Sequence, residues 1–124
     1  MPDKPLKVLL VEDNLPDTEL IRAMLEDADG DFDLDCAARL DEAQALLGSE
    51  AGGKVDLVLL DLGLPDSVGL DTFRRLVASH PDVPVVVLTG LEDVEVGSQA
   101  VQGGAQDYLV KGRVDPEMLR RAVL

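Results

Sequence analysis

Few residues of this chain carry a thiol or an aromatic ring. The 124 residues include one cysteine, no tryptophan, one tyrosine and two phenylalanines. With Cys36 alone, the chain forms no internal disulfide and no cysteine-based zinc site. The core must therefore be aliphatic, and 46% hydrophobic residues are sufficient for one core in a chain of this length. We interpret residues 1–124 as a single domain.

Long apolar runs and cationic residues are also scarce. No run approaches the ~20 apolar residues of a membrane-spanning helix, and the first five residues do not resemble a signal peptide. The 25 acidic residues outnumber the 11 lysines and arginines, which gives a formal charge of −14. Binding to phosphates requires clustered lysine and arginine. We therefore expect a cytoplasmic protein that binds neither nucleic acid nor a membrane directly.

Several short aliphatic runs are present, and each ends at a polar residue. Such runs are typical of buried parallel strands, and in an open α/β sheet ligands bind at the carboxyl ends of the strands. The runs and the residues that follow them are 6–11 with Glu12 and Asp13, 55–60 with Asp61, 83–88 with Thr89, and 107–110 with Lys111. The sequence thus predicts one crevice lined by three carboxylates, a hydroxyl and an ammonium group.

Helical patterns alternate with these strands, which indicates an α/β fold with a parallel sheet. The predicted helices run from Pro16 to Gly30, over 41–47, from a cap at Ser67 to just before Pro81, over 92–102, and from about Pro116. The first helix is predicted to bury one face, formed by Leu20, Ile21, Met24, Leu25 and Ala28. Because only nine residues remain from Pro116 to the end, we interpret the last helix as truncated.

Two segments have weaker patterns. Residues 32–36 alternate apolar and acidic side chains, which predicts a half-exposed strand at a sheet edge. Residues 92–102 form helix poorly, because Val94 and Val96 are β-branched and Gly97 costs about 1 kcal/mol relative to alanine. A weak helix beside a site is a candidate moving part.

The three carboxylates of Glu12, Asp13 and Asp61 would repel one another unless a cation joined them. All the predicted ligands in the crevice are oxygen atoms, with no cysteine or histidine beside them. Oxygen ligands favour a hard cation over zinc or copper. We therefore predict a Mg²⁺ site, with Mn²⁺ as a possible substitute.

A carboxylate can also attack phosphorus and form an aspartyl phosphate. Phosphoryl transfer requires in-line positioning and neutralisation of the phosphoryl oxygens. The metal, the Lys111 ammonium and the Thr89 hydroxyl can each face one oxygen of a phosphoryl group on Asp61. These residues therefore predict a phosphoacceptor site.

In this order and at this spacing, the residues resemble a receiver domain of the two-component response-regulator family over essentially the whole chain. The matching positions are the acidic pair Glu12-Asp13, the acceptor Asp61, Pro65 and Gly69 after it, Thr89, Tyr108 and Lys111. The resemblance implies a flavodoxin-like three-layer α/β/α fold. Its five parallel strands would follow the order 2-1-3-4-5 and be accompanied by five helices.

The resemblance also implies the chemistry of the site. Asp61 would take a phosphoryl group from the phosphohistidine of a sensor histidine kinase or phosphotransfer protein, or from a small phosphodonor. Asp13, Asp61 and the backbone carbonyl of Gly63 would bind the metal, with Glu12 acting mainly through water. The domain would catalyse only its own phosphorylation and slow autodephosphorylation, and it would not be an enzyme in the ordinary sense.

The same resemblance implies a switch. Phosphorylation would draw Thr89 inward, and Tyr108, which can point outward in the free domain, would fill the vacated volume. The surface of the fourth helix, the fifth strand and the last helix would change with it. That surface would control an attached or separate output module, or form a homodimer.

Other classes of protein remain as alternatives. An unphosphorylated docking scaffold would not need the acid, threonine and lysine set. A Mg²⁺-dependent phosphohydrolase of the haloacid-dehalogenase type normally has a second aspartate where this chain has Gly63. A flavodoxin-like flavin carrier would need a phosphate-binding loop where Glu12 and Asp13 would repel a phosphate. The single histidine, His80, is interpreted as a structural or solvent-facing residue at a helix end.

Two positions bear on how long a phosphoryl group would persist. Gly63 and Leu91 have no polar side chain that could position a hydrolytic water, so the resemblance does not fix the phosphoryl lifetime. The stretch 61–70 resembles receivers attached to sensor kinases or diguanylate cyclases. The abrupt end of the chain indicates a domain of a longer protein.

Overall fold

The computed structural model describes residues 6–27, 32–48 and 55–123. Five parallel strands alternate with five helices, and a two-stranded hairpin and a 3₁₀ turn are inserted between them. The strands of the sheet are β1 (Leu6–Val11), β2 (Phe32–Ala37), β3 (Leu57–Asp61), β6 (Val85–Thr89) and β7 (Asp107–Val110). The helices are α1 (Leu15–Asp27), α2 (Leu40–Leu47), α3 (Leu70–Ser79), α4 (Val94–Gln102) and α5 (Pro116–Val123). The hairpin pairs β4 (Gly63–Leu64) with β5 (Ser67–Val68), and the turn is η1 (Leu91–Asp93).

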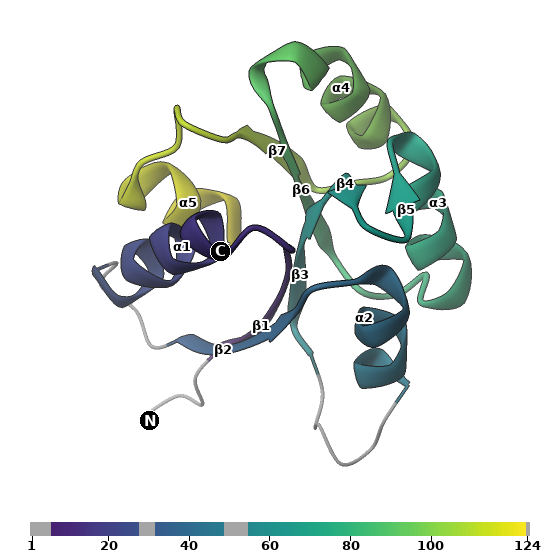
Figure 1. The fold of residues 1–124 in the computed structure, drawn as a ribbon, viewed down its shortest axis with the longest axis horizontal. Helices are drawn as coiled ribbons and strands as arrows, with labels where there is room; N and C mark the ends of the chain where they lie inside the picture. The colour runs from purple at the N-terminus through teal and green to yellow at the C-terminus, as the bar shows by residue number, and fades with distance from the viewer. Residues whose placement is uncertain (1–5, 28–31, 49–54, 124) are drawn as a thin grey trace.

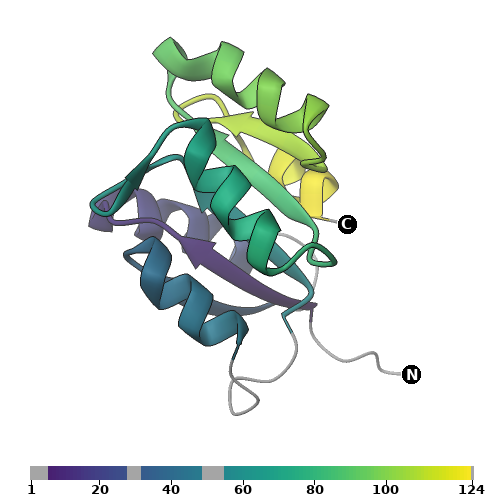
Figure 2. The same ribbon diagram turned by 90° about the vertical axis from the view of Figure 1, so that its right-hand side faces the viewer.

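The sheet has the strand order β2-β1-β3-β6-β7, and all its pairs are parallel. With the hairpin strands left out, this is the predicted order 2-1-3-4-5. Helices α1 and α5 cover one face of the sheet, and α2, α3 and α4 cover the other (Figures 1 and 2). The flavodoxin-like α/β/α fold is therefore confirmed.

Two clusters of aliphatic side chains fill the space between the layers. Side chains alternate along a strand, so Leu9 and Val11 of β1 pack toward α2, α3 and α4, while Val8 and Leu10 pack toward α1 and α5. All four are fully buried. Burial of a large aliphatic side chain contributes about 1.5–3 kcal/mol, so these central strands anchor the fold.

The segment around residues 32–36 is an edge strand, as its alternating pattern predicted. β2 pairs only with β1, and its Asp33 and Cys36 are exposed. β7 forms the opposite edge, with Tyr108 half-buried and Leu109 buried. The strands whose carboxyl ends carry the candidate site are the three inner strands β1, β3 and β6 and the edge strand β7.

Three local predictions were wrong. Ser67 does not cap α3, because it belongs to the hairpin and its hydroxyl lies 2.8 Å from the buried Thr72 hydroxyl. The chain enters α3 through Gly69, whose φ of 79° is a conformation that favours glycine.

The other two wrong predictions concern α1 and β3. Leu20 is 47% exposed, whereas Ile21 and Leu25 of the same predicted face are buried. β3 begins at Leu57 instead of 55 and includes Asp61. Ala28 and Gly30 lie outside the described residues.

Asp66 has a structural role that its loop position did not suggest. The backbone N–H groups of Leu40 and Asp41, at the start of α2, donate hydrogen bonds of 2.9 and 3.0 Å to its two carboxylate oxygens. Arg39, at the N-cap position of α2, makes no capping bond of its own. A residue of the hairpin therefore caps a helix more than twenty positions earlier in the chain, because helix N-termini stabilise carboxylates.

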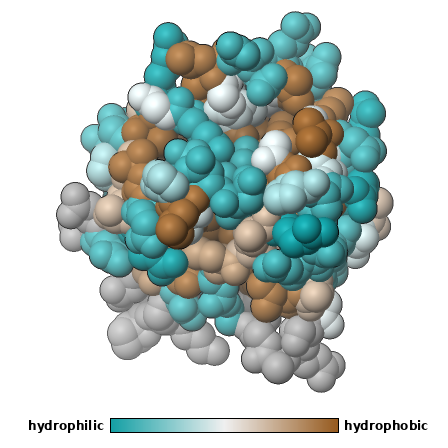
Figure 3. Space-filling view, in the orientation of Figure 1, coloured by the Kyte–Doolittle hydropathy of each residue, from teal (hydrophilic) through white to brown (hydrophobic). Residues whose placement is uncertain are grey.

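The polar and apolar side chains are mixed on the face seen in Figure 3, where apolar groups form small patches between polar ones. The large apolar side chains that are exposed among the described residues are Leu15, Leu20, Val68, Leu91, Val101 and Met118. Within the described part of the chain, no helix combines the length and apolar character needed to cross a membrane.

Candidate functional site

The four polar residues predicted to converge lie at one end of the sheet. Asp61 and Thr89 are the last residues of β3 and β6, while Glu12 and Lys111 directly follow β1 and β7. The strand register brings these ends level, since Asp61 pairs with Leu88, and Thr89 pairs with Val110. The sheet thus provides a fixed frame for the side chains.

Backbone hydrogen bonds extend the frame by one residue beyond two of the strands. The Glu12 N–H donates to the Ala37 carbonyl at 2.9 Å, and the Lys111 N–H donates to the Thr89 carbonyl at 2.8 Å. Glu12 and Lys111 therefore have backbones as well fixed as those of the strand residues. The fixed backbone limits the positions that the Glu12 carboxylate and the Lys111 ammonium can reach.

Three carboxylates form a compact cluster. Glu12, Asp13 and Asp61 each place one carboxylate oxygen within 4.8 Å of the others. Glu12 and Asp61 are only 4% and 6% exposed, whereas Asp13 is open to solvent. Glu12 Oε1 is buried, and it contacts the Lys111 ammonium at 2.5 Å. The cluster offers an all-oxygen set of ligands to a cation approaching past Asp13.

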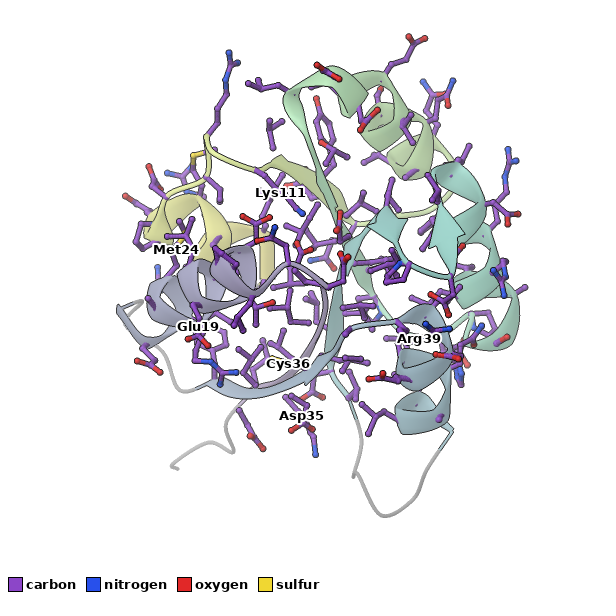
Figure 4. The ribbon with its side chains drawn as sticks, viewed as in Figure 1. Glu19, Met24, Asp35, Cys36, Arg39 and Lys111 are labelled. Atoms are coloured by element: carbon purple, nitrogen blue, oxygen red, sulfur yellow. The ribbon has the colours of Figure 1, made fainter. Side chains whose placement is uncertain are left out.

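The Lys111 ammonium is the cation that this cluster contacts. It lies 2.5 Å from Glu12 Oε1, 3.1 Å from Asp61 Oδ2 and 3.2 Å from Asp17 Oδ2. Figure 4 shows Lys111 in the middle of the molecule, above α1. Asp17, in the first turn of α1, was not among the predicted site residues. In the sequence, Asp17 was explained by the favourable interaction of an acidic side chain with a helix N-terminus, so no site role was assigned to it.

Burial and charge shift the ionisation of two members. The pKa of Glu12 is raised to about 7, first by burial and then by contact with Asp61, an effect that Lys111 only partly opposes. Burial acts to lower the pKa of Lys111, but contact with the carboxylates of Glu12 and Asp61 outweighs it and raises that pKa above its usual range. The site therefore keeps its ammonium charged and holds one carboxyl ready to bind a proton near neutral pH.

A pocket of about 300 Å³ opens in front of Asp61. Thr89 and Lys111 line it together with Gly63, and the exposed Asp93 also reaches it. One Asp61 oxygen, Oδ1, accepts a 3.3 Å hydrogen bond from the Gly63 N–H. Thr89 is buried, and its hydroxyl donates only a long hydrogen bond of 3.5 Å, to the Leu109 carbonyl. The pocket thus brings a carboxylate, a hydroxyl and an ammonium to one volume.

Tyr108 lies outside that pocket but beside it. Its side chain is half-buried and packs on the cluster beneath α4. A Cβ atom at Gly97 would come within 2.9 Å of Tyr108 Cδ2 and 3.0 Å of Thr89 Cγ2. The glycine that weakens α4 is therefore the residue that lets α4 approach Thr89 and Tyr108 this closely.

His80 lies at the other end of α3 from the Asp61 loop. It is the C-cap residue of α3, and its N–H donates to the Leu76 carbonyl at 2.9 Å. This placement agrees with the predicted helix-end position. Among the described residues, none of its hydrogen bonds joins it to the carboxylate cluster.

Comparison with known proteins identifies a family. The response regulator receiver domain model matches residues 8–124. The response regulator GacA of Pseudomonas syringae pv. syringae is 34% identical over 115 residues, which cover 93% of this chain and 52% of GacA. The chain spans about half or less of the length of the curated relatives it matches.

Two solved structures are similar in fold and carry informative descriptions. The phosphorylated cyanobacterial phytochrome response regulator RcpA is 25% identical, with a TM-score of 0.76 over 97% of this chain and 90% of RcpA. The Mn(2+)-bound form of response regulator Rcp1 is 28% identical, with a TM-score of 0.75 over 96% of this chain and 90% of Rcp1.

Proposed function

The chain belongs to the response regulator receiver domain family, and on that premise we propose that it is a cytoplasmic phosphoacceptor in a two-component phosphorelay, with Asp61 as the acceptor. The observation that carries this proposal is the position of Asp61. It stands at the carboxyl end of the central strand β3, with Oδ2 3.1 Å from a charged lysine and a pocket in front of it. The phosphorylated state of the similar RcpA supports the assignment.

The reaction proposed is an in-line transfer. A carboxylate oxygen of Asp61 forms a bond to phosphorus while the P–N bond of a donor phosphohistidine breaks, and the imidazole leaves with the electron pair and takes up a proton. Lys111 pairs with one phosphoryl oxygen. The Thr89 hydroxyl, which holds only a long bond to Leu109, turns to donate to another.

The residues at the site fit a divalent cation. Asp13, Asp61 and the Gly63 carbonyl would hold Mg²⁺, or Mn²⁺ as in the similar Rcp1, with Glu12 beside them, because the carboxylates of Glu12, Asp13 and Asp61 form a compact, all-oxygen donor set. Such an ion supplies neutralisation of charge on the phosphoryl oxygens. Glu12 lies deepest and beside Lys111, so we assign it a role through water, whereas the exposed Asp13 ligates directly.

The partners proposed follow from this chemistry. A sensor histidine kinase or phosphotransfer protein would supply the phosphoryl group, and the exposed Leu20 of α1, which lines a pocket with Lys111, offers it an apolar contact. The output would be read from the surface of α4, β7 and α5, by an attached or separate module or by a second copy. Movement of Thr89 would reach that surface through Tyr108 and Gly97, which are in close packing with it.

Labelling of Asp61 tests the function. Incubation with acetyl phosphate and Mg²⁺ is expected to add one HPO₃, about 80 Da, to Asp61, and mass spectrometry of the intact protein and of its peptides detects it. Asp61→Asn removes the attacking oxygen and is expected to abolish the adduct. An adduct that persisted in this variant, or in wild-type protein with all divalent metal chelated, would contradict the proposal.

The metal assignment predicts a ranking of affinities. Asp13→Asn is expected to weaken Mg²⁺ binding more than Glu12→Gln, because only Asp13 is assigned direct ligation. Loss of a supporting residue such as Glu12 is expected to weaken binding by about tenfold, and loss of Asp13 by more. Calorimetric titration of both variants at the same pH measures it. Equal losses, or a larger loss in Glu12→Gln, would show that the ligand assignment is wrong.

A further inference from the structure

The Lys111 ammonium has a partner outside the set that faces the phosphoryl position. Its side chain donates a hydrogen bond to Asp17 Oδ2, at 3.2 Å. It also contacts Glu12 Oε1 at 2.5 Å and Asp61 Oδ2 at 3.1 Å. Asp17 reaches it from α1, on the other side of the sheet end from the pocket in front of Asp61.

Both ends of this contact are held by backbone bonds. The Asp17 N–H donates to Asn14 Oδ1 at 2.9 Å, and Thr18 donates to the Asn14 carbonyl through both its N–H and its hydroxyl at 3.0 Å. At the other end, the Lys111 N–H is bonded to the Thr89 carbonyl. The backbone that carries Asp17 is therefore fixed, so its carboxylate, whose side chain is 36% exposed, starts from a defined position beside Lys111.

The number of protons on the ammonium makes these partners compete. An ammonium group has three N–H donors, and three carboxylates surround this one. A phosphoryl group on Asp61 needs one of the three donors, and its charge is repelled by a nearby carboxylate. Glu12 and Asp61 belong to the cluster that a cation would join, but Asp17 does not. Asp17 is therefore the carboxylate partner of Lys111 that neither accepts the phosphoryl group nor belongs to this cluster.

We propose that Asp17 is a positioning residue that draws the Lys111 ammonium toward α1 and so limits its availability to the phosphoryl oxygens at Asp61. This inference rests on the proposed phosphoacceptor function. Asp17 then lowers the rate at which a phosphoryl group is transferred to Asp61. Removing its charge releases Lys111 toward the transferring group and also removes a repulsion.

The experiment compares three variants with the wild-type protein. Initial rates of Asp61 phosphorylation are measured with acetyl phosphate and Mg²⁺ over a range of donor concentrations. Asp17→Asn is expected to raise the rate by roughly three- to tenfold, the effect of one unit charge about 6 Å away in a partly solvated site. Asp17→Glu keeps the carboxylate and is expected to return the rate to near that of the wild type, which a purely structural role of the side chain would not produce.

Glu19→Gln is the matched control. It makes the same change of charge on the same helix, but Glu19 pairs with Arg22, and Figure 4 shows it on the opposite side of α1 from Lys111. Its rate is expected to stay near that of the wild type. Equal rates for Asp17→Asn and Glu19→Gln, a slower rate for Asp17→Asn, or a rate for Asp17→Glu equal to that of Asp17→Asn would each overturn the inference about Asp17.

The outcome also separates this inference from the function on which it rests. If the wild-type protein is labelled on Asp61 but the variants do not rank as stated, only the role of Asp17 is refuted. If Asp61 is not labelled at all, or if Asp61→Asn is labelled equally, the phosphoacceptor function fails and the inference fails with it.

Discussion

Lys111→Met is expected to lower the free energy of unfolding by about 2 kcal/mol near pH 8, because it leaves buried carboxylates without their cation. Glu12 and Asp61 are almost fully buried, and Lys111 is the ammonium group that lies within 3.1 Å of both. Methionine keeps the length of the apolar stem, so the loss reports the charge. Urea denaturation of the metal-free protein measures it.

The loss is expected to be smaller near pH 5 than near pH 8, because Glu12 contributes less to it. The pKa of Glu12 is about 7 in the folded protein, against 4.5 as its ordinary value, so between these values the folded state binds more protons than the unfolded state. The free energy of unfolding of the wild-type protein therefore falls as the pH rises through this window. Without Lys111 the pKa of Glu12 rises further, so the fall continues above pH 7. At pH 5, inside this window, Glu12 of the folded state is largely protonated with or without Lys111, so the part of the loss that comes from Glu12 is small.

Lys7→Met is the control for this prediction. The Lys7 side chain has similar exposure, and it pairs at 3.5 Å with Asp35, whose side chain is 44% exposed. Exposed ion pairs contribute about 0–1 kcal/mol, so its loss is expected to be small and to vary little with pH. A loss in Lys111→Met that was as large near pH 5 as near pH 8 would show that the cluster of carboxylates is not the cause.

Gly97→Ala is expected to destabilise the protein by about 1 kcal/mol, although alanine is the better helix former by a similar amount. The added Cβ would lie 2.9 Å from Tyr108 Cδ2, 3.0 Å from Tyr108 Cγ and 3.0 Å from Thr89 Cγ2. Overpacking of this kind typically costs about 1–3 kcal/mol. The clash is with the root of an aromatic ring and a buried threonine, so the ring has to leave its place under α4.

The tyrosine itself reports the displacement. Tyr108 is the only tyrosine and the chain has no tryptophan, so the intrinsic fluorescence comes from this one ring. Quenching by acrylamide is expected to increase in Gly97→Ala. Gly103→Ala is the control, since a Cβ there meets its nearest atoms at 3.5 Å, an ordinary contact, in a backbone conformation open to alanine. Unchanged quenching in Gly97→Ala would refute the packing argument.

The strands and the four polar residues at their ends were predictable because both depend on short-range pattern. Continuous aliphatic runs specify buried parallel strands, and the carboxyl ends of such strands share one edge. This places Glu12, Asp61, Thr89 and Lys111 together without knowledge of any loop. The topology came from the family resemblance, and the structure confirmed it.

The contacts that the sequence did not predict join residues distant in the chain through loops and helix ends. Asp17 and Lys111 are 94 residues apart, and each alone has an ordinary explanation as a surface charge. Ser67 has the residue type of a helix cap, but the hairpin placed it against Thr72, and a glycine with positive φ begins the helix instead. In these cases tertiary packing decided between local options that were close in free energy.

The cap that Asp66 provides for α2 makes two regions of the chain inseparable for engineering. The hairpin that carries Gly63 and Asp66 is the natural segment to exchange between receivers in order to alter the chemistry beside Asp61. A transplanted segment without an acid at position 66 would leave the Leu40 and Asp41 N–H groups unpaired, since Arg39 does not cap them. The hairpin and the start of α2 should therefore be exchanged together. A chimera that exchanges only the hairpin would destabilise the N-terminus of α2, although the sequence of α2 is unchanged.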